Sequence, residues 1–227
     1  MVLFLKPTAC LLESVISMRV VKEAEERKNE ILDAAEELFV TKGYDGTSTG
    51  DILDKVGIAR GTLYYHFKSK EDILDALIER ISASMIREAK KEAGNKKLSV
   101  PDRIVSCILK LRPKSAIGSE VMELVNKPQN ALMHQKMQMI MLNGVIPVIG
   151  ELVEEGISQG IFKTDYPLYA AEMLIGYAVI VFDDSFEQSE EETATRIKAF
   201  IYHTERMLGA KEGSLKKTMM KIFSGKV

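Results

Sequence analysis

Residues 58–74 of the chain have the sequence IARGTLYYHFKSKEDIL, which concentrates aromatic and basic side chains in one short segment. Four consecutive rings occupy positions 64–67, although Phe, Trp and Tyr make up 7% of the chain. No acid occurs from Lys55 to Lys70, whereas the whole chain has a net charge of −2. Because the chain as a whole is slightly acidic, any contact with a nucleic acid must come from a local basic patch. This segment is the candidate for that patch.

The same region is predicted to contain two short helices joined by a glycine. Ser48 and Asp51 approximate a capping box that starts the first helix, and Gly57 ends it. The second helix is expected from about Ala59 to His66. Such a pair forms a helix-turn-helix, in which the first helix braces the second and the second enters the DNA major groove. By composition alone, the segment favours nucleic-acid binding and a purely structural role equally.

The second helix is predicted to have two chemically different faces. Leu63 and Phe67 lie four residues apart and are expected to pack together in the core of the small domain. Tyr64 and Tyr65 are adjacent, so they cannot both face inward, and at least one of them should be exposed.

The start of the second helix carries residue types that can read bases. Arg60, Gly61 and Thr62 are placed there. Arginine pairs bidentately with guanine, and a threonine methyl group can contact the thymine methyl group. Gly61 allows the backbone to approach the bases closely, while tyrosine hydroxyls and histidine can bind phosphate oxygens.

Helical periodicity dominates the rest of the chain, and no strand pattern competes with it. Further helices are expected over about residues 22–42, 69–93, 115–125, 167–182 and 189–208, with one opened by Ser99 and a long one from about Pro128. Pro147 is expected to kink or divide that long helix. The predicted class is all-α, with three small helices, a linking helix and a larger bundle. We divide the chain into a leader (1–18), a helix-turn-helix domain (19–68), a bundle domain (69–210) and a basic tail (211–227). The tail could contact DNA or be flexible, and we favour a flexible tail.

The first 18 residues are interpreted as an accessory or non-native leader, with Met18 as an alternative start. They are apolar, but Pro7 and Glu13 interrupt them, and no clean cleavage site follows. No later apolar stretch is long enough to span a bilayer, so no membrane partner is expected. Cys10 and Cys107 form no CxxC motif, which favours a reducing cytoplasm.

Residues 43–74, GYDGTSTGDILDKVGIARGTLYYHFKSKEDIL, resemble the DNA-binding domain of the TetR family of bacterial transcriptional regulators. The preceding segment ILDAAEELFVTKG, which ends at Gly43, resembles the first helix of that family. The resemblance covers about residues 27–80 with the spacing intact. It implies an all-helical homodimeric repressor with an N-terminal helix-turn-helix domain and a C-terminal helical bundle for ligand binding and dimerisation.

The family pattern also implies roles for individual residues. Those matching DNA contacts are Thr47 and Ser48 for phosphate, Arg60, Gly61 and Thr62 for bases, Tyr64, Tyr65 and His66 for the groove and backbone, and Lys70 for phosphate. Lys70 lies at the start of the next helix, where its backbone amide would also point toward the phosphate. The chain departs from the pattern at Ala59, where the family often has Ser, and at Leu53 and Val56, where it usually has Ala. Because of these departures, the family pattern does not define which base each side chain contacts.

The bundle domain contains features suited to a ligand pocket and to dimerisation. Methionine side chains are flexible and suit adaptable apolar pockets, although ordinary core packing explains any single one of them. The candidate pocket residues are Met133, Met137, Met141 and Cys107, the last of which would also fit as a small buried residue. The final two helices are too apolar for the surface of a monomer, and the resemblance implies that they pair with their twofold mates. The candidate interface residues are Leu174, Ile175, Ala178, Ile197, Phe200 and Ile201.

The sequence favours a regulator over an enzyme. It has no phosphate-binding GxxxxGK[ST] motif and no GxSxG elbow, and His134 and His203 have no partners at metal-binding spacing. We therefore expect no catalytic residues, no metal and no cofactor. The predicted function is a repressor that binds a pseudo-palindromic double-stranded operator as a homodimer and is released by an unknown small apolar or amphipathic effector. The alternative is a helical ligand-binding or scaffold protein whose helix-turn-helix mediates protein contacts.

Overall fold

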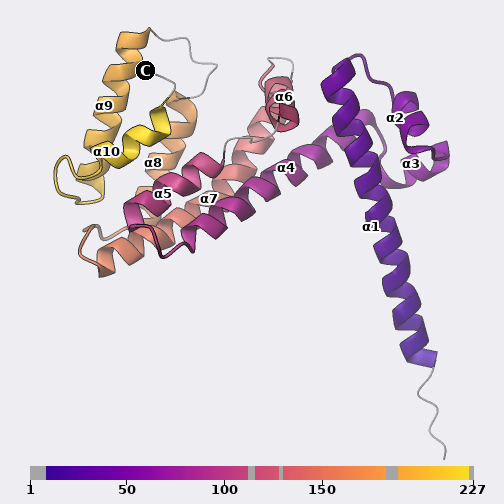
Figure 1. The fold of residues 1–227 in the computed structure, drawn as a ribbon, viewed down its shortest axis with the longest axis horizontal. Helices are drawn as coiled ribbons and strands as arrows, with labels where there is room; N and C mark the ends of the chain where they lie inside the picture. Colours follow the sequence, from indigo (N-terminus) through magenta and orange to yellow (C-terminus); the bar gives the residue numbers. More distant parts are fainter. Residues whose placement is uncertain (1–8, 112–115, 128–129, 183–188, 225–227) are drawn as a thin grey trace, which may run out of the picture. The chain divides into compact units, whose positions relative to one another are not determined.

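The computed structural model describes residues 9–111, 116–127, 130–182 and 189–224, and all of its regular elements in these ranges are helical (Figure 1). The elements are α1 (Ala9–Lys42), α2 (Thr49–Val56), α3 (Arg60–His66), α4 (Lys70–Ala93), α5 (Val100–Lys110), α6 (Ala116–Val125), α7 (Ala131–Ser158), α8 (Pro167–Val181), α9 (Glu190–Met207), α10 (Lys216–Met219) and the 3-10 helix η2 (Met220–Phe223). The predicted all-α class is confirmed. In the same ranges, no helix combines the length and the apolar character needed to cross a membrane.

The chain divides into two compact units, an N-terminal unit (Met1–Leu77) and a C-terminal unit (Ile78–Val227). The division falls inside α4, whereas the sequence suggested a boundary at 68/69. The reason is that Ile73, Leu74 and Leu77 are completely buried, so the first two turns of α4 complete the core of the small unit. A single continuous helix thus belongs to both units.

The N-terminal unit is built around the apolar stripe of α1. Its buried side chains are Ile31, Leu32, Ala34, Ala35, Leu38 and Phe39 from α1, Ile52 from α2, Leu63 from α3, and Phe67. The helix α1 begins at Ala9, well before the start near residue 22 that the periodicity predicted. No proline or glycine lies between Ala9 and Lys42, so nothing in that segment breaks the helix at Met18. The remainder of the predicted leader, residues 1–8, lies outside the described residues.

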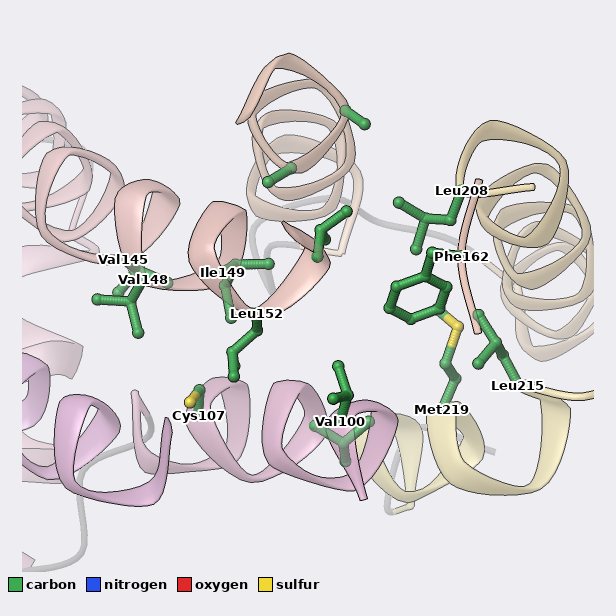
Figure 2. Close-up of a cluster of buried hydrophobic side chains, with 14 of the residues drawn as sticks. Val100, Cys107, Val145, Val148, Ile149, Leu152, Phe162, Leu208, Leu215 and Met219 are labelled. Carbon is green, nitrogen blue, oxygen red and sulfur yellow. The ribbon is translucent and has the colours of Figure 1, made fainter. Parts of the chain in front are cut away.

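The C-terminal unit packs α7 against α5, α6 and α8 around an apolar core (Figures 1 and 2). Pro147 does not divide α7, which runs unbroken from Ala131 to Ser158. Proline removes one backbone donor from the helix, but Val145, Val148 and Ile149 around it are buried. Burial of these side chains holds the helix together where the proline weakens it.

A buried arginine joins three helices of the C-terminal unit. The Arg103 side chain is 2% exposed, and its guanidinium forms an ion pair with Glu155 of α7. It also donates to the carbonyl oxygen of Ala93, at the end of α4, at 3.0 Å. The pKa of Glu155 is lowered to about 2, mainly by its hydrogen bonds with the Arg103 guanidinium and secondarily by the hydrogen bond from the Lys96 ammonium. This contact fixes the ends of α4, α5 and α7 to one another.

The C-terminal tail is folded over its described residues, 211–224, and the expectation of a flexible tail is wrong for this part. Residues 216–223 form α10 and η2, and Leu215, Met219 and Phe223 are buried in the core of the C-terminal unit. Lysines are interspersed along this segment, but the apolar residues Leu215, Met219 and Phe223 recur every four positions and form one buried face. The predicted domain therefore extends beyond residue 210.

Candidate nucleic-acid interface

The helix α2 is anchored at both of its ends. The Ser48 hydroxyl accepts from the Asp51 amide at 3.1 Å, and the Asp51 carboxylate accepts from the Ser48 amide at 2.8 Å, which confirms the capping box. Lys42 of α1 donates to the same carboxylate at 2.6 Å. These contacts, Lys42 first and then Ser48, lower the pKa of Asp51 strongly. At the other end, Gly57 adopts the left-handed conformation (φ 72°) that favours glycine, and the chain turns toward α3.

The helix α3 separates an inward face from an exposed face, as its sequence predicts. Leu63 and Phe67 are buried, so they fix the orientation of the helix against the core. Tyr64 is 42% exposed and Tyr65 is 79% exposed, which places two large rings at the surface. The Arg60 guanidinium carbon lies 5.7 Å from the centre of the Tyr64 ring, a distance typical of a cation–π contact.

Gly61 lies at an open position on the exposed side of α3. A Cβ atom added there would meet no atom within 4 Å. The glycine is therefore not required for packing within the unit. Glycine costs stability inside a helix relative to alanine, and one of its uses is to let the backbone approach another molecule closely.

The predicted basic patch is smaller in the structure than in the sequence. Lys55 pairs with Glu37 of α1 at 2.7 Å, and the Lys70 ammonium is used within the unit. Among the described side chains, no acidic partner lies within ion-pair distance of Arg60 or Lys68. The cations available to an anionic partner on this surface are therefore Arg60 and Lys68.

The side chains of Thr47 and Lys70, which were predicted to contact phosphate, have hydrogen-bond partners within the N-terminal unit. Thr47 is 1% exposed, and its hydroxyl donates to the carbonyl oxygen of Gly43 at 2.8 Å. The Lys70 ammonium donates to the carbonyl oxygens of Tyr44 and Thr47 at 2.8 and 2.9 Å and lies 4.2 Å from the centre of the Tyr44 ring. Both side chains stabilise the turn between α1 and α2, a role that spacing along the sequence does not reveal.

The turn between α1 and α2 packs on the aromatic ring of Tyr44. This ring meets Phe39 of α1 edge to face, with 5.1 Å between the ring centres. Burial, and then the carboxylate of Glu71, raise the pKa of Tyr44 to about 12. The turn that leads into α2 is thus held by an aromatic pair and by an internal lysine.

The C-terminal unit contains a cavity of about 750 Å³ that is lined mainly by apolar side chains. Met137 and Met141 of α7 line it, as predicted. Sequence reasoning missed the polar side chains of His134 and Gln138, whose nitrogen atoms lie 3.1 Å apart. Their spacing of four residues on one helix was visible in the sequence, but only the fold shows that this face of α7 borders a cavity.

The other two candidate pocket residues, Met133 and Cys107, are not in the cavity lining. Cys107 is completely buried in the core of the C-terminal unit, where its thiol donates to the carbonyl oxygen of Ala89 at 3.1 Å. Burial, and then Glu92, raise the pKa of the Cys107 thiol to about 11. Assigning Cys107 to the pocket is therefore wrong, whereas its alternative interpretation as a small buried residue is confirmed.

The six residues predicted to form a dimer interface are divided between the core and the cavity of the C-terminal unit. Ile197 and Ile201 are buried in its core, and the cavity is lined by Leu174, Ile175, Ala178 and Phe200. Because α8 is apolar around most of its circumference, its sequence does not show which of its faces would meet a partner. The large exposed side chains on and beside this helix are Tyr166, Leu168, Tyr169, Met173, Tyr177 and Ile180.

Two family models match the chain. The model of bacterial regulatory proteins of the tetR family matches residues 31–77, and the model of the tetracyclin repressor-like C-terminal domain matches residues 115–203. Over 158 residues the chain is 28% identical to the fatty acid metabolism regulator protein of Bacillus subtilis, an alignment that covers 68% of this chain and 80% of that protein.

Two further proteins extend the comparison. The chain is 38% identical over 77 residues to the transcriptional regulator AcrR of Shigella flexneri. This alignment covers 34% of this chain and 35% of AcrR, so it matches about a third of that protein. The solved structure of RolR in complex with resorcinol aligns with a TM-score of 0.59 at 13% identity, over 88% of this chain and 95% of that one. At that identity the likeness concerns the fold.

A braced helix pair with an exposed basic and aromatic face places the protein in the class of helix-turn-helix DNA-binding regulators. The two matching models extend this assignment into the C-terminal unit. The chain belongs to the TetR family of bacterial transcriptional regulators.

Proposed function

We propose that the protein is a ligand-responsive repressor that binds a pseudo-palindromic operator as a homodimer. The observation that carries the proposal is the division of α3, with Leu63 and Phe67 buried while Arg60, Gly61 and Tyr65 are exposed. A helix held rigidly by one face can present the other face to base edges in a fixed orientation.

In the proposed interface, Arg60, Gly61 and Thr62 read bases at the start of α3. Tyr64, Tyr65 and His66 contact the groove and the sugar-phosphate backbone, and Lys68 supplies a phosphate contact. Ser48 and the amides at the start of α4 remain candidates for phosphate binding, since the first amides of a helix have no intrahelical acceptor.

The exposed apolar stripe on α8 is the proposed dimer surface. Tyr169, Met173, Tyr177 and Ile180 recur at helical spacing and are exposed in the single chain. A contiguous exposed stripe of this kind marks an interaction surface. A twofold dimer would place two recognition helices about 34–36 Å apart, one turn of DNA.

The proposed effector is small and apolar or amphipathic. The cavity of about 750 Å³ offers aromatic and aliphatic walls, with His134 and Gln138 as polar partners. The Bacillus subtilis relative is a fatty acid metabolism regulator, which is consistent with an effector that carries an apolar chain. Binding would favour a conformation in which the two recognition helices no longer match successive grooves, and the continuous helix α4 would transmit the change.

The experiment is a binding titration with fluorescent DNA that flanks the gene of this protein, compared with scrambled DNA of equal length at moderate salt. Sequence-selective binding by the unliganded protein, lost on addition of an effector, is expected. Effector and operator must weaken each other by the same factor, so an effector that binds equally well with and without operator is not the inducer. If no selective binding is found, the alternative of a scaffold protein with a helix-turn-helix for protein contacts would be favoured.

A further inference from the structure

The folded C-terminal segment, residues 213–224, forms one side of the cavity, and we call it the C-terminal wall. Its cavity-lining residues are Leu215, Thr218, Met219, Ile222, Phe223 and Ser224. Figure 2 shows Leu215 and Met219 of the wall pointing toward Phe162 and Leu208. The Phe223 ring lies 4.8 Å from the ring of Phe182, measured between ring centres. The wall is therefore a direct boundary of the space that an effector would occupy.

A buried carboxylate holds the start of the wall. Glu205 of α9 is 4% exposed, and its two oxygens accept from the amides of Gly213 and Leu215, both at 2.8 Å. Gly213 has a positive φ of 75°, so the chain turns sharply as it passes this carboxylate. Each oxygen has its own donor, and the contact therefore fixes the direction in which the chain leaves the turn.

The other end of the wall has a weaker attachment. Lys221 pairs with Asp102 at the start of α5 at 2.9 Å, but the lysine side chain is half exposed. Ion pairs at the surface contribute little, whereas hydrogen bonds from amides to a charged acceptor are among the stronger ones. A helix as short as α10 is not stable by itself in water. The position of the wall therefore depends on Glu205 and on the burial of its apolar residues.

We propose that the C-terminal wall determines which ligands the cavity accepts and how long it retains them, with Glu205 as the positioning residue that holds the wall. The inference rests on the proposed function, since it requires the cavity to be the effector site. Glu205 is not among the residues that line the cavity; it acts through the backbone of Gly213 and Leu215. Met219 and Phe223 are the side chains that limit the length of an apolar ligand.

The test uses the full chain and the neutral fluorescent probe N-phenyl-1-naphthylamine. Glu205→Gln keeps the shape of the side chain but turns one acceptor into a donor that faces a backbone N–H group. It should raise the dissociation rate of the probe about tenfold and speed hydrogen exchange at Gly213 and Leu215. The matched control is Glu212→Gln, since Glu212 is an exposed acid that pairs with Arg206 at the surface. This control should leave both measurements as in the unaltered protein.

A second variant tests selectivity independently of stability. Met219→Ala should lengthen the cavity, so 1-dodecanol should displace the probe better relative to 1-octanol, by about fourfold for each methylene accommodated. A purely structural role would weaken both alcohols alike and leave their ratio unchanged. If Glu205→Gln does not fold, this ratio decides the question by itself.

The outcomes separate the inference from the proposed function. If the unaltered protein binds neither the probe nor the alcohols, the cavity is not an apolar ligand site, and the proposed effector site fails together with the wall. If the unaltered protein binds them but Glu205→Gln and Met219→Ala behave like it, only the role of the wall is overturned.

Discussion

The two units of the protein form their proposed recognition surfaces in opposite ways. In the N-terminal unit, the exposed face of α3 comes from a few consecutive residues, with Arg60 at one end and Tyr65 near the other. In the C-terminal unit, the cavity is assembled from distant parts of the chain, from Pro101 in α5 to Phe223 at the end of η2. A repeating polymer such as DNA can be recognised by one rigid helix, whereas a small molecule has to be surrounded.

Disrupting the small core should have the largest effect and should separate the two units. Leu63 is buried beneath α3, and Leu63→Ala should cost about 2–5 kcal/mol of the unfolding free energy of the N-terminal unit. DNA binding should be lost, while the C-terminal unit still binds an apolar probe. Calorimetry together with probe fluorescence would measure this, with Leu132→Ala as the control because Leu132 is exposed. A single transition that lowers both properties together would show that the units unfold as one.

The next largest effect concerns the exposed face of α3. If Arg60 reads guanine, Arg60→Ala should cost about 1–3 kcal/mol of discrimination between the operator and a site altered at that base. Lys68→Ala should weaken binding to all sequences similarly and lower the slope of log affinity against log salt by about one. DNA titrations at several salt concentrations would measure both quantities. Equal, salt-insensitive losses from the two changes would contradict this division of roles.

Lys70 shows why the structure changes the choice of variant. From the sequence, Lys70→Ala would be the test of a phosphate contact. In the structure the Lys70 ammonium is bound to the carbonyl oxygens of Tyr44 and Thr47, so the change would loosen the turn before α2. Lys68 lies exposed on the surface and is the cleaner substitution.

A smaller effect is expected at Gly61, where stability and DNA binding should change in opposite directions. An added Cβ meets no neighbour within 4 Å, so Gly61→Ala should stabilise α3 by up to about 1 kcal/mol through helix propensity. The same methyl group would lie between the helix and the bases and should weaken operator binding. Urea unfolding and DNA titration would test the two halves. Unchanged operator affinity in a stabilised variant would show that the backbone at Gly61 does not approach the DNA.

The sequence predicted the N-terminal unit well because its determinants are local. Ser48 and Asp51 form a capping box within four residues, Gly57 ends α2, and Leu63 and Phe67 share one face of a short helix. The internal roles of Thr47 and Lys70 were not predictable in this way. Their partners depend on how α1, α2 and α4 meet, and in isolation a basic or hydroxyl side chain is equally suited to phosphate.

The C-terminal unit was predicted less well because its contacts join distant residues. The faces of α8 cannot be distinguished by periodicity because the helix is apolar around most of its circumference, so the sequence did not show that Leu174 and Ile175 line the cavity. The C-terminal wall was missed since lysines conceal the apolar face formed by Leu215, Met219 and Phe223. Glu205 gave no signal at all, because its partners are backbone amides.

At neutral pH the smallest effect concerns Cys107, which tests how strongly its surroundings in the C-terminal unit disfavour a negative charge. The raised thiol pKa means that the folded protein binds this proton more tightly than the unfolded chain, whose thiol has the ordinary pKa of about 9. The stability contributed by this thiol should be fully present below pH 9 and should be lost as the pH rises from about 9 through about 11. Near neutral pH the thiol is protonated in both the folded and the unfolded chain, so it should not make the unfolding free energy depend on pH.

Urea unfolding between pH 8 and pH 11 in a Cys10→Ser background would measure this dependence, and Cys107→Ala should remove the part due to the thiol. The contrast with the N-terminal unit is direct, because the exposed side chains of α3 are arranged to meet an anionic partner, whereas the surroundings of Cys107 resist even one negative charge. A thiol that reacts with an alkylating reagent at pH 8 as fast as a free cysteine would show that this interior opens readily to water.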